Sequence, residues 1–217
     1  MGRDARDTRE KLIRAGERLF ARRGVDGALT RDIVAEAGQA NGSAVHYHFG
    51  SRQGLLLAIA DKHIGRMEPA RADHLARIAQ DGLSEELAVV VTGLVQPTAA
   101  ELGTEDGRDF LRITAQLAGY AGFRVGETPA PVAGTALEHQ LHLLEGCCRT
   151  RLPEPVALER MATIVGLLTA TLADRARNID EGGPILLEHA TFVDNLTLMI
   201  VAAIGAPVPA GEPVRPG

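Results

Sequence analysis

The chain has 217 residues, is 45% hydrophobic and 24% charged, and carries a formal net charge of −5 at neutral pH. This is enough for one large domain, or for a small domain followed by a larger one. The chain has no apolar run of about eighteen residues and no secretory signal, so we expect a cytoplasmic protein without a membrane span. Its two cysteines, Cys147 and Cys148, are neighbours, which favours a reducing compartment and a packing role. Alternating β-branched runs are absent, which argues against a sheet.

Charge is unevenly distributed along the chain. Residues 1–52 carry ten Lys or Arg and seven Asp or Glu, a net charge of +3, so residues 53–217 carry −8. A basic amino-terminal part on an acidic remainder suits phosphate contact at one end only.

The first predicted helix covers about residues 8–23, where apolar residues recur with the 3.6-residue helical period. A short second helix follows, with Ile33 on its apolar stripe, and Gly38 ends it. Asn41 or Ser43 can cap a third short helix, because either side chain can accept a hydrogen bond from an unpaired backbone amide.

The third helix ends in a polar and aromatic tip, residues 46–49, that is too hydrophilic for a core. Gly50 then breaks the chain, and Ser51 can cap a long helix after it. Two short helices with a tight turn, braced by helices on either side, offer a side-chain-rich helix to a DNA major groove. The sequence therefore predicts a DNA-binding regulator.

A family resemblance rests on residues in the same region. In order along the chain they are Thr8-Arg9-Glu10-Lys11-Leu12-Ile13, Leu19-Phe20, Arg23-Gly24, Arg31-Asp32-Ile33-Val34, Ala37-Gly38, Tyr47-His48-Phe49-Gly50-Ser51-Arg52 and Gly54-Leu55-Leu56. With these residues the chain resembles the DNA-binding domain of the TetR-like (tetracycline-repressor-like) transcriptional regulators. The resemblance implies an all-α protein of about nine or ten helices that is not an enzyme and needs no cofactor.

Three regions are expected on this basis. Residues 1–52 form the helix-turn-helix domain, and residues 53–205 form a helical domain for effector binding and dimerisation. Residues 206–217, rich in proline and glycine, are expected to be a disordered tail. Within residues 53–205, we expect Pro69 and Pro97 to kink or interrupt their helices, because proline cannot donate to the carbonyl one turn earlier.

The residues expected to contact DNA fall into two groups. Those expected to hold the phosphate backbone are Thr30, Arg31, Tyr47, Ser51 and Arg52, of which the last two stand at a helix amino terminus that favours an anion. Those expected to read base edges are Asn41, Ser43, Ala44 and His46. His48 and Phe49 are expected to pack against the bracing helix instead.

The resemblance also implies a small-molecule effector that releases DNA. The candidate lining is apolar with scattered polar groups, which is typical of a ligand pocket, and consists of Phe110, Thr114, Leu117, Tyr120, His139, His142, Met161 and Val165. His139 and His142 lie one helical turn apart and could hold a metal, but such pairs are common on charged helices, so no metal site is predicted.

The last two predicted helices, residues 156–177 and 185–204, are candidates for oligomerisation. Their apolar stripes consist of Leu158, Met161, Val165, Leu168 and Leu172, and of Phe192, Val193, Leu196, Met199 and Ile200. Burial of both stripes within one subunit is the alternative. The resemblance favours a homodimer, in which two helices from each subunit form a four-helix bundle and the two heads read a palindromic site about 34–36 Å apart.

Two other functions remain open from the sequence. One is a helical enzyme with an unrecognised site, although no Ser-His-Asp set, phosphate loop or H-E-x-x-H motif is visible. The other is a ligand-independent protein that coats DNA without sequence preference. The preferred interpretation is a repressor that binds a palindromic operator as a homodimer.

Overall fold

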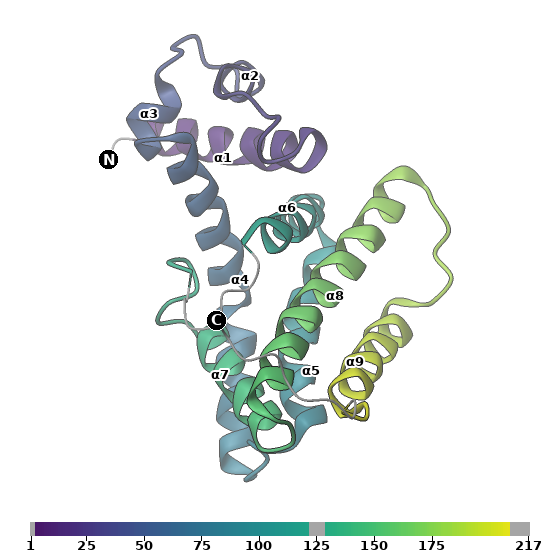
Figure 1. The fold of residues 1–217 in the computed structure, drawn as a ribbon. Coiled ribbons are helices and arrows are strands. Elements are labelled where there is room, and N and C mark those ends of the chain that lie inside the picture. The colour runs from purple at the N-terminus through teal and green to yellow at the C-terminus, as the bar shows by residue number, and fades with distance from the viewer. Residues whose placement is uncertain (1–2, 122–128, 209–217) are drawn as a thin grey trace.

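The computed structural model describes residues 3–121 and 129–208, and these residues form helices and turns without a β-strand (Figure 1). The helices are α1 (Arg3–Arg23), α2 (Thr30–Glu36), α3 (Ala44–Phe49), α4 (Arg52–Gln80), α5 (Leu87–Ala100), the 3-10 helix η1 (Glu101–Gly103), α6 (Glu105–Ala121), α7 (Ala136–Arg149), α8 (Glu154–Glu181) and α9 (His189–Gly205). The all-helical prediction is confirmed. The predicted tail lies outside the described residues from residue 209 onward.

Helices α1 to α3 and the first two turns of α4 form a small amino-terminal unit, called the head below. Its core is a cluster of buried side chains that includes Leu12, Phe20, Ile33 and Leu55, all of which are fully buried. Figure 1 shows the head at one end of the molecule, with α4 running from it into the rest of the chain, called the body. Because Phe110 and Ile113 of α6 complete the head's core, α6 joins the two parts.

Pro69 does not interrupt its helix. Helix α4 continues from Arg52 to Gln80 with Pro69 inside it. Packing of α4 against α5 and α7 supports the helix around Pro69.

Helix α5 likewise continues through Pro97, contrary to the prediction. Pro97 cannot donate to the carbonyl of Gly93, and the side chain of Gln140 supplies the missing hydrogen bond, with Nε2 3.0 Å from that oxygen. A donor from α7, 47 residues away, therefore satisfies the carbonyl that the proline leaves free.

The body is built around α8, which packs against α6, α7 and α9, while α9 also lies against α5 (Figure 1). Gly182, at φ +68°, ends α8, and the chain turns so that α9 returns beside it. Length and composition alone would let α8 span a membrane, although core helices of soluble proteins meet the same criterion. Only 28% of its apolar window is buried in the protomer, so α8 also has a largely uncovered side.

The predicted oligomerisation stripes are in large part the protomer's own core. Met161 and Leu172 of α8, and Val193, Leu196 and Ile200 of α9, are all buried within the body. These five residues are therefore unavailable to a second subunit. Their large side chains face α5 to α7, and the opposite, uncovered sides of both helices carry mostly small or polar residues, which hydrophobic periodicity does not detect.

Cys147 and Cys148 are both buried and unbridged, as expected of a packing role. Burial raises the pKa of the Cys148 thiol to about 11, so this thiol stays protonated and unreactive at neutral pH.

Candidate nucleic-acid interface and its junction with the body

The turn between α2 and α3 is held by short-range hydrogen bonds. Gly38, at φ +66°, ends α2 in a conformation that favours glycine. The Asn41 carboxamide oxygen then accepts hydrogen bonds from the backbone N–H and the hydroxyl of Ser43, at 3.0 and 2.7 Å. Asn41 thus shapes the entry into α3 by an Asx-type turn. At the other end of α3, Ser51 caps α4, since its hydroxyl accepts from the Gly54 amide at 2.9 Å.

Helix α3 has one buried and one exposed side. Tyr47 is 79% exposed, and His46 beside it is also exposed, as are Asn41 and Ser43 in the turn. Ala44, predicted to meet a thymine methyl, is only 6% exposed and packs in the head's core, so that prediction is wrong. The first residue of so short a helix must face inward to fix α3 on the head.

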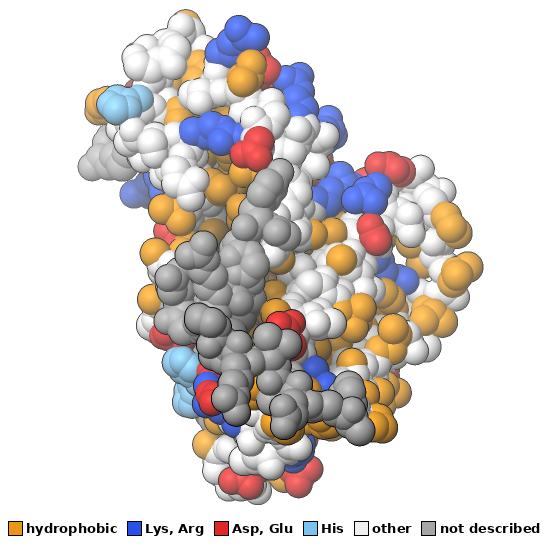
Figure 2. Space-filling view, viewed as in Figure 1, with side chains coloured by type: hydrophobic (Ala, Val, Ile, Leu, Met, Phe, Trp, Pro, Cys, Tyr) orange, Lys and Arg blue, Asp and Glu red, His pale blue; other side chains and the backbone are white. Residues whose placement is uncertain are grey.

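The residues predicted to hold phosphate differ in how exposed they are. Arg31 extends from the first turn of α2 with 82% of its side chain exposed, near the half-buried Thr30. Ser51 is exposed at the start of α4. Figure 2 shows Lys and Arg side chains spread over the part of the surface that the head forms.

Arg52, predicted to hold phosphate, is half-buried and engaged within the head. Its Nε donates to the Ala28 carbonyl at 3.0 Å, and its guanidinium lies 5.2 Å from the centre of the Phe20 ring. Arg52 therefore clamps the segment before α2 to the head's core, because the cation gains both a hydrogen bond and the ring's negative face.

Phe49 packs against the head's core, and the Arg9 guanidinium lies 5.0 Å from its ring centre. His48 is half-buried between the rings of Tyr47 and Phe49, with centroids 4.9 and 6.2 Å away. Phe49 therefore packs as the sequence analysis expected, whereas the ring contacts of His48 are with its neighbours in α3.

The predicted effector lining is not brought together. Phe110 is buried at the junction of head and body and stacks on His63, with ring centroids 4.3 Å apart, while Leu117 packs against the head's core. His139 and His142 are exposed on α7. The helical period places these residues correctly on their helices, but it does not say which helices face one another.

The other four residues of the predicted effector lining do not come together either. Met161 is part of the body core, Val165 is half-buried on α8, and the Thr114 hydroxyl donates to the Leu111 carbonyl at 2.8 Å. The side chain of Tyr120 lies outside the described residues. Clefts of about 440 Å³ between α1, α6 and α8, and of about 200 Å³ between α4, α5 and η1, are lined by other residues.

A network of ion pairs connects head and body where α1, α4, η1 and α6 meet. His63, which is fully buried, has Nε2 2.9 Å from Glu17 and Nδ1 2.5 Å from Glu101. Lys62 bridges Glu17 and Asp106 at 2.7 and 2.8 Å. The Arg66 guanidinium joins Glu101 to Asp106, which extends the network to the start of α6.

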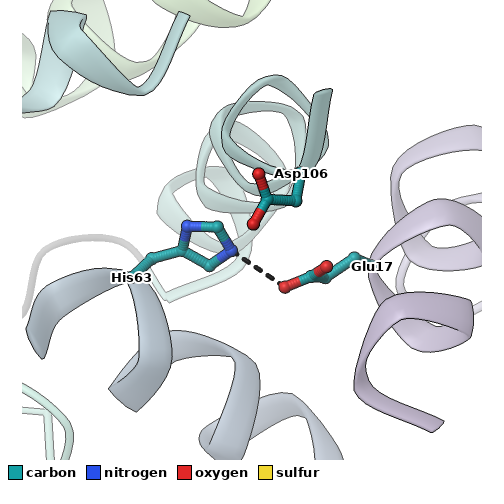
Figure 3. A group of neighbouring side chains, drawn as sticks. All are labelled: Glu17, His63 and Asp106. Atoms are coloured by element: carbon teal, nitrogen blue, oxygen red, sulfur yellow. Dashed lines mark hydrogen bonds and ion pairs between the residues drawn. The ribbon is translucent and has the colours of Figure 1, made fainter. Parts of the chain in front are cut away.

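Glu17, His63 and Asp106 are close enough together to hold a metal ion, with potential ligand atoms within 4.8 Å of one another (Figure 3). The donor set does not suit one, however. The same Glu17 oxygen already accepts from Lys62 and from His63, and the Lys62 ammonium supplies the positive charge that a metal would bring. We therefore describe the group as an internal salt-bridge network, which is called the junction network below.

The junction network makes the stability of this protein depend on the charge of His63. Burial pushes the pKa of His63 down, but hydrogen bonds and Coulomb attraction from Glu101 and Glu17 outweigh burial, and the pKa is raised. Arg66 and Lys62 face the same carboxylates, and Arg66 Nη2 lies 2.9 Å from His63 Nδ1, where both groups share one Glu101 oxygen.

A group with a raised folded-state pKa stabilises the fold fully below its unfolded-state pKa, about 6.5 for histidine, and this stabilisation is lost as pH rises through the folded-state value. We expect the melting temperature to fall over that interval in the wild type and to fall less in His63→Gln. His139→Gln, at an exposed histidine, should keep the wild-type pH profile. Thermal melts across the pH range measure this, and identical slopes for wild type and His63→Gln would contradict it.

The sequence analysis missed the junction network, although a signal for it was present. Glu17 follows Gly16 on the apolar stripe of α1, and His63 follows Ile59 by one turn on the apolar stripe of α4. A titratable residue on the buried face of an amphipathic helix needs a partner, so two of them in neighbouring helices predict one another.

Helices α2 and α3, with an exposed side of α3 on a head that carries Lys and Arg at its surface, have the arrangement of a helix-turn-helix unit. Residues 12–59 match the family model described as bacterial regulatory proteins, tetR family. This match identifies residues 12–59 as a domain of the tetR-family type, the domain over which the chain also resembles transcriptional regulators.

Two curated relatives are similar over the same domain. The HTH-type transcriptional repressor AcnR of Corynebacterium glutamicum is 33% identical over 61 residues, which cover 28% of this chain and 32% of AcnR. The HTH-type transcriptional regulator TtgR of Pseudomonas putida is 36% identical over 78 residues, 36% of this chain and 34% of TtgR. The matched segments thus span about a third of these relatives' length.

The whole fold has a counterpart among solved structures. A gamma-butyrolactone receptor described as an ArpA-like protein aligns over 91% of this chain and 98% of its own, with a TM-score of 0.50 and 22% identity. At this identity the likeness concerns the arrangement of the helices.

Proposed function

We propose that the protein is a repressor that binds a palindromic operator as a homodimer and is released by a small molecule bound to the body. The observation that carries this proposal is the exposed strip of Asn41, Ser43, His46 and Tyr47 on the otherwise anchored α3 and the turn before it. His46 and Tyr47 are exposed, and among the described residues the side chains of Asn41 and Ser43 form hydrogen bonds only within this pair, so these residue types are best explained by contact with another molecule.

Each side chain of the strip has a role in this proposal. His46 and Ser43 can reach base edges, and Asn41 does so only with the part of its amide that the Ser43 hydrogen bonds leave free. The phosphates that flank these bases are held by Tyr47, Arg31, Thr30 and Ser51. Arg52 acts indirectly, by fixing the segment before α2.

The homodimer would use the uncovered sides of α8 and α9. On α9 these are the exposed residues Leu198, at 67%, and Met199, at 48%, with Asn195 one turn before them. On α8 the exposed Gly166 and Ala170 leave room for a second helix to approach closely. Of the predicted interface residues, Met199 stays at the centre of this face, and Leu158, Val165, Leu168 and Phe192 are only half-buried at its margins.

Effector release requires a connection from body to head, and α6 provides one. The Gln116 side chain accepts from the Val25 amide at 2.7 Å and donates to the Phe20 carbonyl at 3.3 Å. Arg14 of α1 binds Asp109 at 2.7 Å, and on its other side α6 is tied to Asp180 of α8 through Arg112. A displacement of α6 would therefore move the head. In this proposal, residues 1–52 carry DNA binding, and residues 53–205 carry regulation and dimerisation.

Selection of binding sites from random double-stranded DNA tests the proposal. A repressor of this kind should enrich a short palindrome, whereas a protein that coats DNA should retain all sequences weakly, and an enzyme should retain none. Enrichment without symmetry would contradict the proposed homodimer.

Arg31→Ala should weaken binding to all sequences alike and reduce the slope of log K against log salt by about one, since one phosphate contact is lost. The matched control is Arg52→Ala, whose guanidinium is engaged within the head and should leave the slope unchanged while lowering stability. Titrations at several salt concentrations measure both. A reduced slope for Arg52→Ala alone would reverse the two assignments.

A further inference from the structure

One charged side chain of the body is buried without a charged partner. Arg71 of α4 is 1% exposed, and no described carboxylate forms an ion pair with it. Its Nη1 donates to Gln140 Oε1 at 2.5 Å, and its Nη2 donates to the Thr98 hydroxyl at 2.8 Å. Its Nε is buried with no hydrogen-bond partner among the described residues.

The charge itself persists under physiological conditions. Burial lowers the pKa of Arg71 to about 10, against the weaker opposing attraction of Glu68 and Glu101, so the guanidinium is still protonated at neutral pH. A buried cation that meets only neutral acceptors keeps much of its desolvation penalty. Glu68 lies one turn earlier; its Oε1 accepts from the Ala136 amide at 2.7 Å, and its buried Oε2 has no hydrogen-bond partner among the described residues. Arg71 therefore feels the attraction of Glu68 and Glu101 but forms no direct ion pair with either carboxylate.

A small cleft reaches close to this charge. Its volume is about 200 Å³, and it is lined by Arg66, Met67, Ala70, Pro97, Ala100, Glu101 and Thr104. The Met67 sulfur lies 3.7 Å from Arg71 Nη2, so the flexible Met67 side chain stands between the cleft and the guanidinium. Arg71 itself does not line the cleft, so a ligand there would reach the guanidinium only if the Met67 side chain moved aside.

We propose that Arg71 is an anion receptor, and that the ligand of this cleft is a small aliphatic carboxylate. The carboxylate would pair with Nε and Nη2 side by side, the geometry for which a guanidinium is suited, and would supply the missing hydrogen-bond acceptor. The aliphatic part would lie against Met67, Ala70 and Pro97. The cleft volume restricts the ligand to a short chain.

Such a ligand would act on the head through residues that it touches directly. Arg66 and Glu101 line the cleft and are also members of the junction network, where Glu101 holds His63 and Arg66. As an account of the effector, this inference rests on the proposed function. Anion binding itself is measured without DNA, so failure of one proposal is distinguishable from failure of the other.

Hexanoate is a suitable probe, and the neutral hexanamide is its matched control. Titrated against the full chain in calorimetry and thermal melts, hexanoate should bind and raise the melting temperature, whereas hexanamide should do neither. Arg71→Met should bind hexanoate about ten to a hundred times more weakly, because the charged hydrogen bonds are lost.

A second variant keeps the test decisive if Arg71→Met does not fold. Thr98→Asp places a carboxylate next to Arg71 within the protein, so it should abolish hexanoate binding and leave the guanidinium in place. Thr98→Val removes the hydroxyl without adding charge and should retain binding. The proposal is overturned if hexanoate does not bind the wild type, or if Thr98→Asp binds it as well as Thr98→Val does.

Discussion

Replacement of Leu198 by aspartate is expected to convert the homodimer into a monomer that no longer binds its palindromic operator. Leu198 is 67% exposed on the uncovered side of α9, and in the proposed four-helix interface it would be buried twice, once from each subunit. Loss of about 2 kcal/mol of apolar burial per copy amounts to about 4 kcal/mol per dimer, or about a thousandfold in the dissociation constant. Burial of two carboxylates adds to this penalty.

The protomer itself should be unaffected by this change, since the core residues of α9 face the other way. Sedimentation measures the mass, and circular dichroism verifies that the helices are retained. Leu186→Asp is the matched control, because Leu186 is 88% exposed in the connection between α8 and α9, outside the helical face. A dimeric Leu198→Asp variant would place the interface elsewhere.

Replacement of Glu17 by glutamine is expected to lower the free energy of unfolding by about 3 kcal/mol, because removing one charge from a buried ion pair leaves its partners unpaired. Glu17 is fully buried, and its two oxygens lie near three cationic groups, those of Lys62, His63 and Arg14. Glutamine fills the same volume, so the loss reports charge rather than packing. For a chain of this size the melting temperature should fall by about 10 °C.

A surface ion pair provides the control for this measurement. Lys11 and Asp7 are 2.7 Å apart, with 55% and 62% of their side chains exposed, so Asp7→Asn should leave the melting temperature unchanged. The loss in Glu17→Gln should also loosen the head, which hydrogen exchange of α1 and α4 amides would detect. Equal stability of the two variants would show that the junction network does not hold head and body together.

The amino-acid sequence by itself determined the elements of the head. Gly38 and Gly50 bound the two short helices because each adopts a positive φ, and Ser51 caps α4 through its own side chain. These are local effects that involve residues at most a few positions apart. They therefore appear in the sequence as spacing, as does the all-helical fold through its 3.6-residue period.

Only the tertiary structure decided which segment each helix face packs against. Pro97 remains inside α5 because Gln140 supplies a hydrogen bond from 47 residues away. The large stripes of α8 and α9 face their own protomer, and Glu17 meets His63 only because α1 crosses α4. Periodicity shows that a helix has an apolar side, but the partner of that side depends on packing between distant segments, which no local pattern contains.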